Sequence, residues 1–159
     1  MFQLTLLTLK LIHVLGAAVL FGTGLGIAFF MFVAHRTRDP AAIAHTGRVV
    51  VIADTLFTAS AVVVQPVTGV ALASIMGYSL GDSWIVAALG LYVLIGMCWL
   101  PVVAIQLRLR DIAGDAAKHG APLPPDYFAL FRVWFWLGWP AFAGMIAIFV
   151  LMIWKPQLW

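Results

Sequence analysis

The chain has 159 residues, of which 64% are hydrophobic and only 9% are charged. Soluble domains carry about 25% charged residues, so this composition excludes an ordinary soluble domain. The net charge of +3, from nine basic and six acidic side chains, is too small to indicate nucleic-acid binding, and we expect an integral membrane protein.

Four long apolar segments fill most of the chain, at residues 8–34, 46–76, 84–107 and 130–154. Each can cross a hydrocarbon core of about 30 Å, which takes about 20 residues of helix. The connections between them are too short to form another domain. We therefore expect one all-α domain over residues 1–159, a bundle of four transmembrane helices in a multi-pass protein whose partner is the lipid bilayer.

The first segment carries His13, the strongest candidate for a binding residue. Imidazole can be an axial ligand of haem or a ligand of copper or zinc, although a lone intramembrane histidine is often only a hydrogen-bonding group. Lys10 lies one turn earlier and could pair with a haem propionate. Further along, Ala18, Gly22 and Gly26 form a ridge of small residues that we expect to pack inside the bundle, with a homodimer face as the alternative.

Asp39 and Pro40 precede the second segment and are a typical N-cap and first-turn pair, so its helix should begin near Ala41, before the apolar part. Within it, polar side chains recur at spacings that confine them to an arc of about 80° at 100° per residue. This polar face consists of Asp54, Thr58, Gln65 and Thr68.

Asp54 differs from the other members of the polar face because a carboxylate inside a membrane needs a partner or a proton. Arg132 and Arg48 are predicted near the same side of the membrane. The sequence leaves two roles open for Asp54: a structural ion pair, with Arg132 as a partner, or a proton relay.

In the third segment, Tyr92, Trp99 and Gln106 follow one another at heptad spacing and so share one helix face. We expect Tyr92 and Trp99 to stack against a ring bound between the helices. Each of the last three segments also contains a proline. In lipid, the backbone carbonyls freed by such prolines must be satisfied by neighbouring helices, which favours a packed bundle.

Basic residues flank the first and third connections, whereas the middle connection, at residues 79–83, carries only Asp82. The positive-inside rule therefore places the first and third connections in the cytoplasm and both termini outside. The flanking basic residues are Arg36, Arg38, Arg48, Arg108, Arg110, Lys118 and Arg132. The localisation that we expect is a bacterial cytoplasmic (inner) membrane.

Several short motifs resemble the uncharacterised integral membrane family called domain of unknown function 2269. They are Leu9–His13, Ala34–Arg36, Gln65–Gly69, Trp99–Val103 and Gln106–Arg108. More distantly, Lys10 and His13, with a second histidine 22 residues after His13, resemble HemJ-type protoporphyrinogen oxidases and CopD-type copper-resistance membrane proteins. The HemJ resemblance implies that His13 binds haem b and that the bundle carries out electron transfer.

Three hypotheses for function follow. The first is a membrane redox protein that binds haem b through His13, with Lys10, Gln65, Tyr92 and Trp99 around the cofactor, and exchanges electrons with a small reductant. The second is a copper-handling protein of the CopD kind, which would use His13 with methionines. The third is a non-catalytic subunit or assembly factor. The sequence leaves open whether the chain is an enzyme and whether it forms a homodimer or a larger membrane complex.

Overall fold

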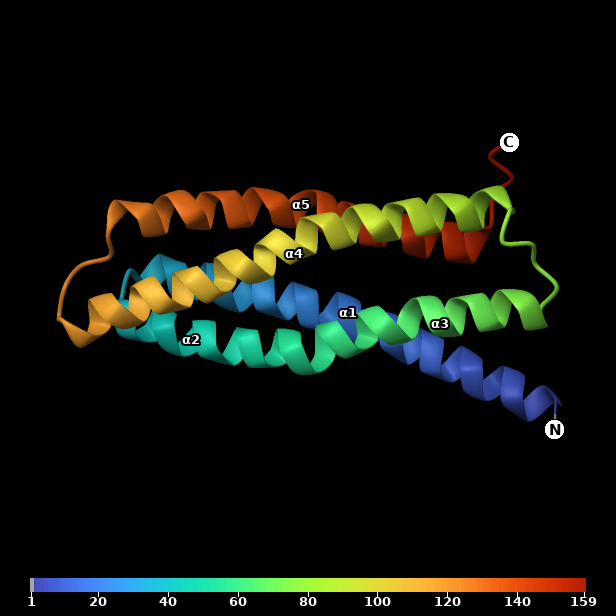
Figure 1. Ribbon diagram of the computed structural model, residues 1–159, viewed down its shortest axis with the longest axis horizontal. Coiled ribbons are helices and arrows are strands. Elements are labelled where there is room, and N and C mark those ends of the chain that lie inside the picture. The colour runs from blue at the N-terminus through green and yellow to red at the C-terminus, as the bar shows by residue number, and fades with distance from the viewer. Residues whose placement is uncertain (1) are drawn as a thin grey trace.

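The computed structural model describes residues 2–159, which form helices joined by short connections (Figure 1). The elements are α1 (Phe2–Thr37), α2 (Pro40–Ala53), the π-helix η1 (Asp54–Thr58), α3 (Ala59–Ile75), α4 (Ser83–Lys118) and α5 (Pro125–Trp154). Because α2, η1 and α3 follow one another without a break, they form one rod, and residues 2–159 contain four long apolar helices able to cross a membrane. The predicted all-α, multi-pass fold is confirmed.

Local chemistry determines where these helices begin and end. The Asp39 carboxylate accepts the Ala41 N–H at 2.9 Å, and Pro40 occupies the first helical position, so α2 begins one residue before the predicted start. At the same end of the bundle, α4 ends at Lys118 and Gly120 follows with a φ of +60°, a conformation that glycine adopts without strain.

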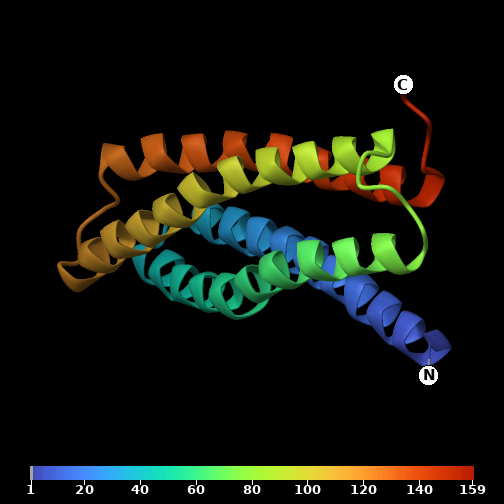
Figure 2. The same cartoon turned by 45° about the vertical axis from the view of Figure 1, so that its right-hand side comes forward.

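The four rods do not pack evenly along their lengths. Helix α5 packs chiefly against α4, while α1 packs against α2, η1 and α3, and α2 joins the two groups through α4. Both views show α1 and α3 diverging from α4 and α5 toward the end that carries both termini, which we call the termini end (Figures 1 and 2). The opposite end holds the two connections that are rich in basic residues.

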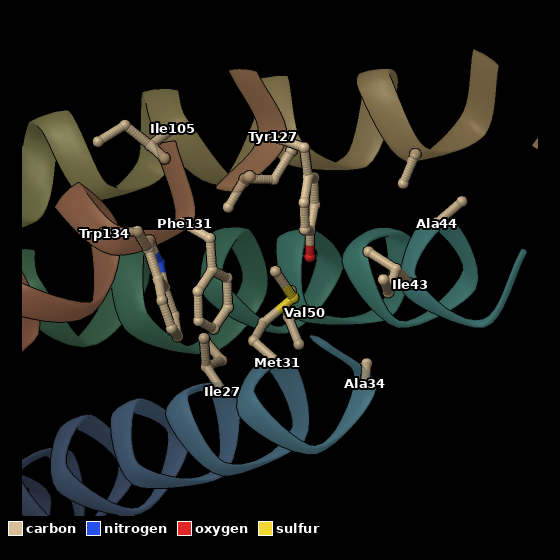
Figure 3. Close-up of a cluster of buried hydrophobic side chains, with 12 residues drawn as sticks. Ile27, Met31, Ala34, Ile43, Ala44, Val50, Ile105, Tyr127, Phe131 and Trp134 are labelled. Carbon is tan, nitrogen blue, oxygen red and sulfur yellow. The ribbon is translucent and has the colours of Figure 1, made fainter. Parts of the chain in front are cut away.

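A cluster of buried apolar side chains lies toward the end opposite the termini, where all four rods meet (Figure 3). Met31 of α1, Ile43 of α2, Leu109 of α4 and Tyr127 of α5 are essentially inaccessible there. Large apolar side chains elsewhere are exposed, such as Ile153 at 75%. Exposed apolar surface on this scale is unfavourable in water and is typical of a protein covered by lipid.

The C-terminal tail, residues 155–159, folds back over the connection between α3 and α4. The Leu158 N–H donates to the Ser83 hydroxyl at 2.8 Å, and the Lys155 ammonium donates to the Tyr78 hydroxyl at 2.8 Å while lying 4.6 Å from the Tyr78 ring centroid. The tail therefore fixes the end of α5 to the start of α4 at the termini end.

The predicted internal role for the small-residue ridge on α1 is wrong. Ala18 and Gly22 are exposed, and a Cβ built on Gly22 would meet no atom of another element within 4 Å. A close helix contact lies instead between α2 and α4, where a Cβ on Gly47 would come within 3.0 Å of the Arg110 Cβ. Regular spacing of small residues identifies a helix face that could pack closely against another helix. The packing of the whole bundle determines which of these faces makes the contact.

Candidate functional site

His13 of α1 is bound to α3 through its ring and its backbone. Its Nδ1 lies 2.8 Å from the Thr68 hydroxyl, and the Gln65 amide Nε2 donates to the His13 carbonyl at 3.0 Å. Both α3 residues are buried and belong to the predicted polar face. The structure thus brings together two predicted site residues, His13 and Gln65, and adds Thr68 as the direct partner of the imidazole.

The hydrogen bonds of Thr68 determine which imidazole nitrogen carries the proton. A threonine hydroxyl has one proton, and the Thr68 hydroxyl lies 2.8 Å from the Val64 carbonyl of its own helix and 3.2 Å from the Gln65 carbonyl. Because the hydroxyl donates to the backbone, it accepts from His13 Nδ1–H. The other nitrogen, Nε2, then carries the lone pair and is the one able to bind a metal.

Two glycines allow the side chains of α1 and α3 to interleave. A Cβ on Gly69 of α3 would lie 3.2 Å from His13 Cε1, and a Cβ on Gly16 of α1 would lie 3.4 Å from Gln65 Cδ. Each glycine makes room for the side chain of the opposite helix. Sequence reasoning did not assign either glycine to the site, because a glycine in an apolar helix has many other uses.

The predicted polar face is buried along its whole length, since Asp54, Thr58, Gln65 and Thr68 are all between 5% and 8% exposed. Two of its oxygens, Thr58 Oγ1 and Gln65 Oε1, have no hydrogen-bond partner among the residues that the structure describes. Unsatisfied buried polar atoms are rare in proteins and costly in hydrocarbon. The face therefore carries more polar atoms than the contacts between the helices satisfy.

Asp54 accepts a hydrogen bond from the Trp99 indole N–H of α4 at 3.2 Å. The predicted ion pair with Arg132 does not form: within residues 2–159, the ion pairs join Arg110 to Asp111 and Lys118 to Asp115. The reason is geometric, because η1 packs among α1, α2 and α3, whereas Arg132 lies on the exposed surface of α5. The proton-relay role of Asp54 stays a prediction.

Tyr92 of α4 donates its hydroxyl proton to the Val62 carbonyl of α3. This carbonyl lies four residues before Pro66, which has no N–H to donate to it. The neighbouring helix thus satisfies a carbonyl freed by proline, as expected for a packed bundle in lipid.

The structure divides the predicted set of site residues into two groups. Thr68, the partner of His13, and Asp54, the partner of Trp99, are 14 residues apart, about 21 Å along the helix axis. We predicted that a ring bound at His13 would stack on Trp99. As long as Trp99 is bonded to Asp54, it lies too far from His13 for that contact. Lys10 is exposed one turn closer to the terminus than His13.

No compact metal centre accompanies His13 within residues 2–159, where no group of three or more His, Cys, Asp or Glu side chains could hold a metal ion. The nearest histidine along α1 is His35, 22 residues or about 33 Å away. Its ring stacks on Phe131, 3.6 Å between centroids, near the opposite end of the bundle. His35 is therefore out of reach as a second ligand beside His13.

In comparisons with known proteins, the family model described as "Predicted integral membrane protein (DUF2269)" matches residues 7–156. No curated protein and no solved structure matches the chain.

Proposed function

We propose that this chain, which belongs to the DUF2269 family of predicted integral membrane proteins, is a redox protein. In this proposal it binds haem b through His13 and transfers electrons within the membrane to or from a small reductant. We further propose that it does so in a bacterial cytoplasmic membrane, with both termini outside. Haem supplies one-electron redox chemistry when bound, and its potential depends on its axial ligand and surroundings.

The observation that carries this proposal is the hydrogen-bonded pair of His13 and Thr68. Histidines that bind metals almost always donate their other ring N–H to an oxygen acceptor, which fixes the tautomer and the ring orientation. Here Nδ1 donates to Thr68 Oγ1 at 2.8 Å, and the Thr68 hydroxyl is itself directed to the Val64 carbonyl. The lone pair at Nε2 is therefore oriented before any ligand binds.

The surrounding residues fit a haem in part. Lys10, on the exposed surface beyond His13, offers a cation for a propionate, and Gln65 Oε1 is a buried acceptor with no partner next to the imidazole. Trp99 does not fit, because its N–H is bonded to Asp54, which lies 14 residues or about 21 Å along the helix axis from Thr68. Tyr92 is bonded to the Val62 carbonyl, six residues or about 9 Å from Thr68, and stays in the proposed site. The proposal therefore rests on His13, Lys10, Gln65 and Tyr92 and leaves Trp99 out of the haem site.

The test is the absorbance spectrum of the protein purified from cells supplied with haem. We expect a Soret band in the wild type and in His35→Ala, the matched control, and none in His13→Ala. A colourless wild type, or a Soret band that survives His13→Ala, would overturn the proposal. Metal analysis of the same samples that found copper without haem would favour the copper-handling hypothesis instead.

A further inference from the structure

We propose that the buried polar face of η1 and α3 is a proton path that connects Asp54, inside the bundle, with the site at His13. This inference deepens the proposed function. The path ends at the cofactor, so that end point rests on the proposal that His13 binds haem. The path runs along one side of the rod formed by η1 and α3, with one hydroxyl from α4, and requires no movement of the helices.

The polar groups along this face follow one another in short steps. After Asp54 come the Thr58 hydroxyl, the Val62 carbonyl with the Tyr92 hydroxyl bound to it, and the Gln65 amide. The steps are four, four and three residues, or about 6, 6 and 4.5 Å along the helix axis. Tyr92 thus fills, from α4, the gap that the sequence of α3 leaves between Thr58 and Gln65.

Unpaired oxygens at two of these steps point to water as the bridging group. Thr58 is 7% and Gln65 8% exposed, and the side-chain oxygen of each has no partner in the described part of the chain. Buried waters bind where several polar groups converge and would satisfy both oxygens. The Thr58 and Tyr92 hydroxyls and these waters pass the proton along, because each of their oxygens takes one proton and releases another. The Val62 carbonyl and the Gln65 amide only position them, and the water at Gln65 Oε1 receives the proton beside His13.

The π-helix lies where the path begins. Residues Asp54–Thr58 form η1, and the Ala59 N–H donates to the Asp54 carbonyl five residues earlier instead of four. Single π turns inside α-helices are frequent at functional sites. Here the turn places Asp54 and Thr58 on the same buried side of the rod.

Asp54 faces few other titratable groups. Among neighbouring spans, α1 carries none between His13 and His35, α4 carries only Tyr92 and Cys98 between Asp82 and Arg108, and α5 carries none between Arg132 and Lys155. No cation of residues 2–159 forms an ion pair with the Asp54 carboxylate. In the proposed path the Asp54 carboxyl, which no ion pair among the described residues neutralises, holds a proton and passes it to a water bound at Thr58.

The experiment is infrared spectroscopy of the reconstituted protein, in which the wild-type minus Asp54→Asn difference identifies the protonated carboxyl band. We expect this band to shift on transfer to D2O, at a rate at least tenfold lower in Thr58→Val and in Tyr92→Phe. Thr58→Ser should restore the rate, because it keeps the hydroxyl. Thr55→Val is the matched control, since Thr55 is exposed and bonds to its own helix.

The proposal is overturned if no carboxyl band depends on Asp54, or if Thr58→Val and Tyr92→Phe exchange at the wild-type rate. It is also overturned if Thr58→Ser exchanges as slowly as Thr58→Val, because packing and not the hydroxyl would then set the rate. The Soret band of the same samples separates the two proposals. Hydroxyl-dependent exchange in colourless protein would support the path and refute the haem.

Discussion

His13 is a polar side chain in an apolar helix. The orientation of its ring is set by a residue of another helix. The Thr68 hydroxyl accepts the imidazole N–H and donates its own proton to α3, so neither partner is free to turn without losing a bond. Hydrogen bonds between membrane helices contribute on average about 0.6 kcal/mol and up to about 2 kcal/mol. A bond of that size can orient a ring, although it contributes little to the stability of the whole fold.

We predict that His13 and Thr68 are energetically coupled by about 1 kcal/mol. The measurement is a double-mutant cycle of His13→Ala and Thr68→Val, with free energies of unfolding from denaturation in mixed detergent micelles. Valine matches the shape of threonine, so the cycle isolates the hydroxyl. Thr55→Val combined with His13→Ala is the control and should show no coupling, whereas equal coupling in both cycles would contradict a direct bond.

The sequence allowed us to predict which polar residues belong to the site, but not which residues they bond to. His13, Gln65 and Thr68 could be singled out because polar side chains in lipid are costly wherever they lie. Which residue each one meets depends on the register between helices, and no local pattern in this chain encodes that register. The pairing of Asp54 with Trp99 in place of Arg132 is the clearest example.

At the scale of the helices, glycine has opposite roles on two of them. Gly47 of α2 lies against the backbone of α4, where an added Cβ would come within 3.3 Å of the Arg110 Cα. Gly22 of α1 has open space around it. The regular spacing around Gly22 suggested a packing face, yet the contact formed at Gly47, which has no such repeat.

We predict that Gly47→Ala lowers the free energy of unfolding by about 1–2 kcal/mol, because α2 and α4 must move apart to admit the methyl group. Gly22→Ala should be neutral or stabilising by up to about 1 kcal/mol, since alanine is the better helix former and meets no neighbour. Detergent denaturation of the two variants side by side is the measurement. Equal effects would mean that the α2 and α4 crossing is not close-packed in the membrane.

At the scale of the whole molecule, the four rods could be predicted because the bilayer dictates their length and apolar composition. Their division into two diverging groups could not. Lipid chains are as apolar as leucine, so no hydrophobic force draws the helices together along their whole length. The arrangement depends on a few contacts, such as Tyr92 to Val62 and the C-terminal tail to Ser83, that composition does not reveal.

The two ends of the bundle differ in charge, and this difference predicts its orientation in the membrane. The connection at residues 79–83 carries only Asp82, whereas basic residues flank the other two connections at the opposite end. Moving such basic clusters across a membrane is unfavourable, so we predict that they stay in the cytoplasm. The same prediction places the middle connection and both termini outside.

Single cysteines test this orientation, because Cys98 can first be replaced by serine to give an unreactive background. In intact cells, a membrane-impermeant maleimide should label Gly81→Cys in the middle connection, while Pro122→Cys in the last connection should react only after the membrane is opened. Both positions are exposed, so access to the reagent and not burial decides the outcome. The reverse pattern would place the termini in the cytoplasm and, with them, the end of the bundle toward which His13 lies.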